Sequence, residues 1–190
     1  MKKRFDAKTL AGVGILTAVV IALQLFSNYI PIFGISPTLA LVPIVVGASL
    51  YGVWAGTWLG FVFSVIALIA PSTAVFFDHN PIATIVIVIA KGTLAGIAAA
   101  LIYRAISGKN QLLAVVLAAI ACPIVNTGIF TLGANWFFRD VFSVGNEATF
   151  WVFFGVLMGI IWLNFLVEFL INLILSPTIV QIIRIGKRGK

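Results

Sequence analysis

Lys91 is the residue of this chain whose type and position most clearly predict chemistry. It is the only charged residue between Ile82 and Tyr103, in a stretch that is apolar and long enough to cross a membrane as a helix. A charge at that depth costs a few kcal/mol, so charged residues inside spans usually face a partner, a cavity or a ligand. Two interpretations of Lys91 follow: a ligand contact, or an internal partner for a carbonyl or carboxylate group.

Asn126 and Thr127 are predicted to lie at the same depth as Lys91, on the next span of the chain. At about 1.5 Å per residue, Lys91 lies roughly 14 Å below the outer end of its helix, and Asn126 is as far from its own helix end near Asn135. Pro123 would loosen this helix and free a carbonyl group. One cation, one amide and one hydroxyl predict a pocket for a small anionic or carboxylate ligand that also carries hydrogen-bonding groups.

Residues nearer the outer surface complete the predicted pocket. Phe130 and Trp151 are expected to lie above it, and Gly155 and Gly159 of the last span leave room beside it. The predicted outer loops span residues 27–37, 71–81 and 135–148. Among the residues that they carry are Asp78, His79, Asn80, Asn135, Trp136, Arg139, Asp140, Asn146 and Glu147. We predict ligand contacts from Asn80 and Asn135; ordinary solvated connections are the alternative for any one of these residues.

A second polar group lies on the last span, where Asn164, Glu168 and Asn172 are spaced i, i+4 and i+8 on one helical face. Counted from the start of this span, Glu168 is roughly 28 Å from the outer end, about 14 Å deeper than Lys91. A direct Lys91–Glu168 pair is therefore not expected. The preferred interpretation is a structural polar seam between neighbouring helices.

The composition places these residues in a membrane protein. Of the 190 residues, 62% are hydrophobic and 9% are charged, and the mean hydropathy is +1.20. A soluble domain carries about a quarter charged residues. The length fits a single domain over residues 1–190. The lone cysteine, Cys122, cannot form an internal disulfide and is expected to be a small core residue.

Six spans are predicted, which makes the chain an all-α membrane protein built as a bundle of six transmembrane helices. The region 38–70 contains 33 uncharged residues, roughly 50 Å as one helix, so we divide it at Tyr51-Gly52. The helix of the last span can continue past Pro177 as an interfacial helix. The six predicted spans cover residues 9–26, 38–50, 53–70, 82–103, 112–134 and 149–175.

The positive charges give this bundle an orientation. Ten Lys and Arg residues lie at the two termini and in the 104–110 loop, against Arg139 alone in the outer loops. By the positive-inside rule both termini are cytoplasmic, which requires an even number of spans. The net charge of +7 is therefore read as membrane topology and not as a sign of nucleic-acid binding.

Small residues recur at four-residue spacing, a pattern that lets helices approach closely in lipid. The stripe of the first span, Gly14, Ala18 and Ala22, either packs inside the bundle or faces another protein. The glycines of the other spans are expected to pack inside the bundle. These residues are Gly52, Gly56, Gly60, Gly92, Gly96, Gly155 and Gly159.

Sequence motifs for enzymatic chemistry are missing. There is no H-E-x-x-H, no P-loop, no G-x-S-x-G and no Cys/His cluster. We therefore expect no catalytic residue, no metal site and no cofactor in this chain, and no ATP hydrolysis by it alone. The pair Asp140 and Glu147 is a poor candidate for a membrane-embedded enzyme.

The chain resembles the substrate-binding S components of energy-coupling-factor (ECF) vitamin transporters. The resemblance rests on size, six spans, polar outer loops, the motif Ala18-Val-Val-Ile-Ala22, and the stretches IPIFGISPTLALVPIVVGASLYGVWAG and NFLVEFLINLILSP. It implies a cell-membrane subunit that binds a vitamin in its outer half. It also implies that the first helix docks on a transmembrane T subunit, that the subunit topples to release the ligand inside, and that two partner ATPases use the ATP.

The segments FDHNP and KGTLAG look most like the pantothenate-type S components, and Lys91 would suit the carboxylate of pantothenate. S components for folate, riboflavin or a pyrimidine precursor share the same frame and remain alternatives. A stand-alone secondary transporter of a small organic anion is the main alternative from another class, with Glu168 as the residue that supports it.

Overall fold

The computed structural model describes residues 6–29, 38–142 and 149–188. Expectations for Asn146, Glu147 and the middle of the first outer loop fall outside these ranges, as does the side chain of Asn164. The described residues form helices and turns without a strand. The elements are α1 (Ala7–Asn28), α2 (Leu41–Tyr51), α3 (Val53–Leu68), α4 (Pro71–His79), α5 (Pro81–Ile106), α6 (Gln111–Phe137), the 3-10 helix η1 (Asp140–Phe142) and α7 (Phe150–Arg188).

Four helical segments of the described chain are long and apolar enough to cross a membrane: α1, α5, α6 and the part of α7 from Phe165 to Ile183. A fifth span is possible if α3 and α4 are counted together across their 78° bend. The apolar helix α2 has 11 residues, about 16 Å, which is shorter than the hydrocarbon core. The chain is thus a multi-pass helical membrane protein, while six spans and cytoplasmic termini remain predictions.

The predicted division of the long apolar region is confirmed. Helix α2 ends at Tyr51, and α3 begins at Val53. Gly52 between them has φ +85°, a conformation that costs a residue with a side chain far more than glycine. One glycine therefore turns a stretch of uniform hydropathy into two helices.

The prediction that residues 71–81 form a loop is wrong, because residues 71–79 form the helix α4. Pro71 occupies the first turn, where its fixed φ suits a helix and its missing N–H costs nothing. The Thr73 hydroxyl donates a hydrogen bond to the carbonyl of Ala67, 2.8 Å away, across the bend from α3. Apolar residues such as Phe76 then turn towards the bundle, so the segment packs against α5 instead of being a solvated connection.

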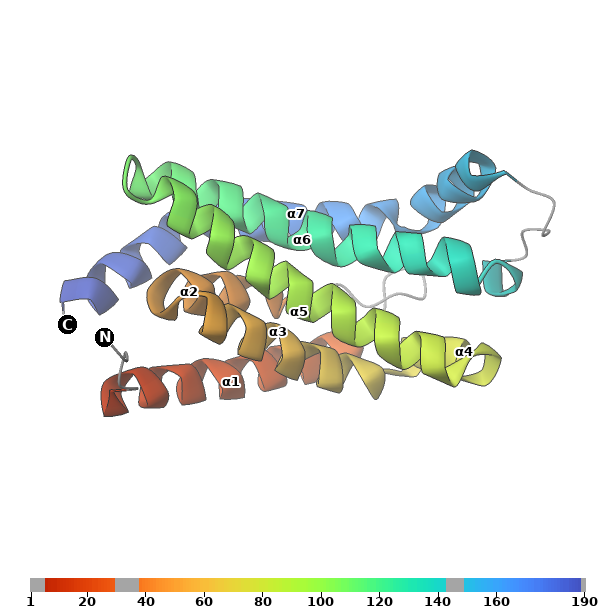
Figure 1. The fold of residues 1–190 in the computed structure, drawn as a ribbon, viewed down its shortest axis with the longest axis horizontal. Helices are drawn as coiled ribbons and strands as arrows, with labels where there is room; N and C mark the ends of the chain where they lie inside the picture. Colours follow the sequence, from red (N-terminus) through yellow and green to blue (C-terminus); the bar gives the residue numbers. More distant parts are fainter. Residues whose placement is uncertain (1–5, 30–37, 143–148, 189–190) are drawn as a thin grey trace.

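The short helix α2 lies in the middle of the bundle, in contact with α1, α3, α5, α6 and α7 (Figure 1). Leu41, Ile44 and Val45 are completely buried, and the core around them includes Phe63 and Val115. A helix that is apolar all round is covered either by protein or by lipid, and here the five neighbouring helices cover it. Helix α2 therefore acts as the central element around which the longer helices pack.

Helices α3 and α5 approach so closely that glycine is required on both. A Cβ atom on Gly60 would collide with the carbonyl oxygen of Gly92, and one on Gly96 would collide with that of Gly56. The expected packing inside the bundle is confirmed for these four glycines. It is wrong for Gly52, which is exposed in the turn between α2 and α3. The contact between α3 and α5 holds the middle of α5 in place, including Lys91, the residue before Gly92.

Helix α7 continues past Pro177, as expected. Its continuation is not interfacial, because Ile179 and Ile183 lie in the hydrophobic core. The packing expected for the glycines of the last span is also wrong. Gly155 and Gly159 are exposed, and no atom lies within 4 Å of the position of a Cβ at either residue. Figure 1 shows the first turns of α7 inclined to the rest of the helix.

The first turn of α1, the turn between α5 and α6, and the last turns of α7 lie at one end of the bundle (Figure 1). Lys8, Arg104 and Lys109 belong to this end. Helix α4, η1 and the start of α7 lie at the other end. The arrangement is what the charge pattern predicts for one basic face and one outer face.

Candidate functional site

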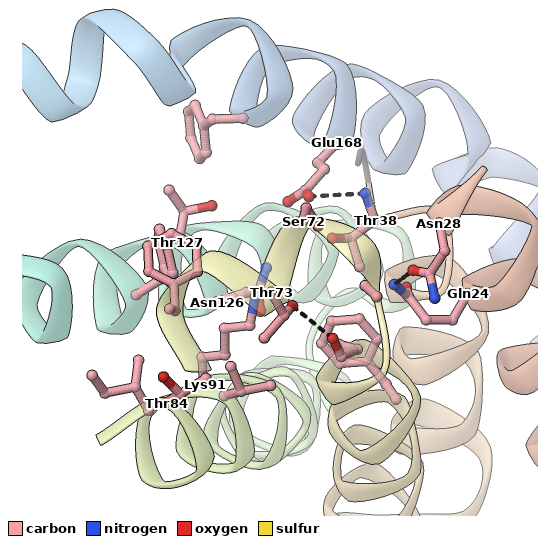
Figure 2. Close-up of a pocket in the computed structure, with 18 of the residues that line it drawn as sticks. Gln24, Asn28, Thr38, Ser72, Thr73, Thr84, Lys91, Asn126, Thr127 and Glu168 are labelled. Carbon is pink, nitrogen blue, oxygen red and sulfur yellow. Dashed lines mark hydrogen bonds between the residues drawn. The ribbon is translucent and has the colours of Figure 1, made fainter. Parts of the chain in front are cut away.

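A polar cavity of about 100 Å³ lies in the half of the bundle opposite the basic end, and six of the helices and the segment before α2 border it (Figure 2). Its polar lining comes from Gln24, Asn28, Thr38, Ser72, Thr73, Thr84, Lys91, Asn126, Thr127 and Glu168. Its apolar lining is mainly aromatic and comes from Phe63, Phe76, Phe130, Phe138 and Phe165, with smaller aliphatic residues. Apolar walls with a few convergent polar groups are typical of a small-molecule site.

Lys91 reaches this cavity from α5. Its Nζ lies 5.2 Å from the centre of the Phe130 ring and 5.9 Å from that of Phe63. Both distances allow a cation–π contact, which partly replaces the water that the ammonium loses. Within the described part of the chain, Lys91 forms no salt bridge at 4.0 Å or less. The ammonium therefore keeps donors available towards the cavity.

Glu168 reaches the same cavity from α7, which corrects the expected separation from Lys91. Figure 1 shows the first turns of α7 inclined to the rest of the helix, so a depth counted along one straight helix from residue 149 placed Glu168 too far from the outer end. The side chain is only 5% exposed, and the backbone N–H of Thr38 donates to Oε1 at 2.9 Å. The other oxygen, Oε2, has no hydrogen-bond partner among the described residues.

Asn126, Thr127 and Phe130 line the cavity from α6, one turn apart, as their shared depth with Lys91 predicts. Asn126 is 3% exposed and its Oδ1 has no hydrogen-bond partner in the described structure. The edge of the Phe130 ring packs against Phe76 of α4 with ring centres 5.5 Å apart, which closes this side of the cavity.

Three other predicted ligand residues are not in this cavity. Asn80 is the N-cap of α5, where its Oδ1 accepts a hydrogen bond from the backbone N–H of Ala83 at 3.0 Å. Asn135 is buried and accepts hydrogen bonds from the Arg139 guanidinium through its backbone oxygen and its Oδ1. Trp151 is 75% exposed near the start of α7. Loop position alone was a weak guide, because caps and local pairs absorb polar side chains.

The cavity also contains polar residues that the sequence reasoning missed. Gln24 and Asn28 line it from α1, and the Gln24 amide nitrogen donates to Asn28 Oδ1 at 2.9 Å. Gln24 Oε1 is buried without a partner in the described residues. Thr38, Thr73 and Thr84 were missed too. The available signal was the i, i+4 spacing of Gln24 and Asn28 at the end of an otherwise apolar span.

The stripe Gly14, Ala18 and Ala22 lies on the opposite face of α1 from the cavity. All three residues are exposed, and no atom lies within 4 Å of the position of a Cβ on Gly14. Buried residues of the same helix, including Val20 and Gln24, lie on its inner face. Helix α1 therefore leaves this small-residue stripe uncovered by the described part of the chain.

Fold and site together define a multi-pass helical membrane protein with a polar cavity for a small ligand in one half of its bundle. A family model for the substrate-specific component of ECF transporters matches residues 8–180. The chain belongs to this family and is a membrane substrate-binding subunit of an ECF transporter. Proteins of this family work in general with a T subunit and ATPases. No significant match to a curated protein or to a solved structure was found.

Proposed function

We propose that this subunit captures a small vitamin with a carboxylate group, pantothenate being the best candidate, from the outer side of the cell membrane. The observation that carries the proposal is the position of Lys91 in the cavity with donors left over. A carboxylate placed on this ammonium would accept charge-assisted hydrogen bonds, which are shorter and stronger than neutral ones. The aromatic walls would cover the apolar part of the ligand.

The size of the cavity supports pantothenate over the larger vitamins. Pockets for drug-sized ligands usually measure roughly 300 to 1,000 Å³, whereas this cavity measures about 100 Å³. Its walls would have to move apart for any whole vitamin, and much further for the ring systems of folate or riboflavin. A pyrimidine precursor is small, but without an anionic group it would leave Lys91 unpaired.

Release into the cell would follow the mechanism of the family. The subunit docks its α1 stripe on the T subunit, topples in the membrane and opens its site inward, while two partner ATPases use the ATP. The exposed surface of Gly14, Ala18 and Ala22 supports this docking. In this proposal the chain itself is not an enzyme and holds no cofactor.

A stand-alone secondary transporter of a small organic anion is the second candidate. Glu168 supports it, because a buried carboxylate beside a cationic ligand site is the kind of group that couples transport to an ion. Uptake by the chain alone in sealed vesicles, driven by an ion gradient without T subunit or ATPases, would support this candidate and contradict the first.

The first test is to identify the ligand. The chain is purified alone, denatured, and its released small molecules are measured by mass spectrometry. We expect pantothenate at near one molecule per chain. A different vitamin would replace pantothenate in the proposal, and an empty protein that no vitamin stabilises against heat would contradict vitamin capture.

The second test concerns Lys91. Lys91→Met removes the ammonium but keeps most of the side-chain length. A hydrogen bond to a charged group is worth about 1.5 to 3 kcal/mol, so we expect pantothenate affinity to fall roughly 10- to 100-fold by calorimetry. Lys109→Met, at the basic end of the bundle, is the matched control and is expected to leave affinity unchanged. Unchanged affinity in a folded Lys91→Met protein would make Lys91 structural.

A further inference from the structure

The cavity is lined by two opposite charges on different helices. Figure 2 shows Lys91 on α5 and Glu168 on α7 pointing into the cavity from opposite sides. Both groups line the same cavity, and no salt bridge at 4.0 Å or less joins them in the described structure. With both groups ionised, the site carries no net charge before a ligand enters.

The cavity lining also contains buried hydrogen-bond acceptors that have no partner among the described residues. These are Glu168 Oε2, Asn126 Oδ1 and Gln24 Oε1, contributed by α7, α6 and α1. Most buried polar atoms in folded proteins have a partner, because an unpaired one retains its full desolvation cost. Three such acceptors on residues of one cavity indicate that the missing partners are donors brought by the ligand.

We propose that the ligand bridges the two charges, with an anionic group on Lys91 and hydroxyl or N–H donors on Glu168. The inference rests on the proposed function for the place of the ligand and adds its chemical class: a small carboxylate that also carries at least one O–H or N–H donor. Glu168 thereby becomes a specificity-determining residue of the capture site.

Electrostatics explains why a simple carboxylate is rejected. It would bring a second negative charge next to Glu168 and leave Oε2 unpaired in a site of low dielectric constant. A ligand with donors between the two negative groups separates them and satisfies the free acceptors. Sites built to bind a substrate hydroxyl discriminate strongly against the analogue that lacks it, for this reason.

The first experiment measures the coupling between the two charges in the ligand-free protein. Lys91→Met, Glu168→Gln and the double variant are compared by thermal unfolding in lipid nanodiscs. No salt bridge joins the two groups in the described wild-type structure, but each single variant leaves the remaining charge in the cavity without its counter-charge. We therefore expect a drop of about 5 °C or more for each and a smaller drop for the double variant. Lys109→Met with Glu168→Gln is the control pair and is expected to be additive. Additive effects of Lys91→Met and Glu168→Gln would overturn the bridge.

The second experiment measures selectivity by calorimetry, with pantothenate and its analogue in which both hydroxyls are replaced by hydrogen. We expect the wild-type protein to prefer pantothenate by about 10-fold or more, and Glu168→Gln to reduce this ratio towards one. Lys91→Met is expected to weaken both ligands alike. A ratio that Glu168→Gln leaves unchanged would overturn the role of Glu168.

The two proposals fail in different ways. If neither compound binds the wild-type protein, the pantothenate assignment is wrong. The chemical class is then decided by the molecule that mass spectrometry recovers from the purified chain. A ligand with both an anionic group and an O–H or N–H donor supports the bridge, and a ligand that lacks either group overturns it.

Discussion

The small-residue stripes of α5 and α1 have the same four-residue spacing but opposite surroundings. On α5, Gly92 and Gly96 meet the backbone of α3 so closely that a Cβ would collide with a carbonyl oxygen. On α1, Gly14, Ala18 and Ala22 are exposed. The comparison teaches that the motif indicates the capacity for close approach, while the neighbour that uses this capacity is set by the rest of the fold.

The two faces of α1 have different surroundings. Its inner face brings Gln24 and Asn28 to the cavity, and its outer face presents the uncovered stripe. One helix therefore contacts both the candidate ligand site and the proposed T-subunit interface. In α5 the stripe instead fixes the backbone that holds Lys91 in the cavity.

Gly60→Leu tests the close packing of α3 on α5 most directly, because it inserts a large side chain where α3 contacts the backbone of α5. Overpacking of this kind costs about 3 kcal/mol, which lowers the melting temperature of a domain of this size by roughly 10 °C. Thermal unfolding in detergent measures it. Gly14→Leu is the matched control and should leave the melting temperature unchanged. Equal effects at the two positions would contradict the assigned environments.

The double variant Ala18→Trp with Ala22→Trp tests whether the exposed stripe of α1 docks on the T subunit. Because both positions are exposed, we expect normal stability and normal ligand binding by the isolated chain, but loss of most ATP-driven uptake with the partner subunits. Val86→Trp, on the exposed face of α5, serves as control and should transport normally. Full uptake by the α1 double variant would place the T subunit on another surface.

A smaller effect is expected from Gly52→Ala, which tests a glycine selected for its backbone angle instead of its close packing. At φ +85° the added Cβ costs about 1 kcal/mol, although no atom lies within 4 Å of it. Gly108→Ala, in a turn without a positive φ, is the control. Chemical or thermal unfolding should show a loss of stability for Gly52→Ala and none for Gly108→Ala.

The smallest effect is expected from Gly155→Ala and Gly159→Ala. Both glycines lie inside α7 in open surroundings, so alanine improves helix propensity without a clash. We expect the stability to rise by up to about 1 kcal/mol or to stay unchanged. A marked loss of stability or of ligand binding would show that these glycines pack as those of α5 do.

Much of the fold was predictable, because segments inside lipid must be apolar and helical, so the apolar stretches of the sequence locate the helices. The predicted spans 82–103 and 112–134 lie within α5 and α6, and the break at Gly52 is where the sequence reasoning put it. The last helix was placed less well. Its hydropathy does not reveal that the first turns incline away, or that the segment after Pro177 packs in the core.

The candidate site was predictable only in part. Lys91 and Asn126 were brought together by counting residues from helix ends, which works when both helices are straight and start at the same level. The count misplaced Glu168, because α7 is not straight and its first turns are inclined to the rest of the helix (Figure 1). The roles of Asn80 and Asn135 could not be read from residue type, since a cap and a ligand contact need the same amide.

By itself, the sequence determined that this is a helical membrane protein of several spans with a cation at mid-depth, because charge and hydropathy act residue by residue. Only the tertiary structure decided that Lys91 shares a cavity with Glu168 and Gln24, that α2 lies at the centre, and that one small-residue stripe is packed while another is open. Those outcomes depend on the inclination and rotation of helices relative to one another, which the packing of distant segments sets together.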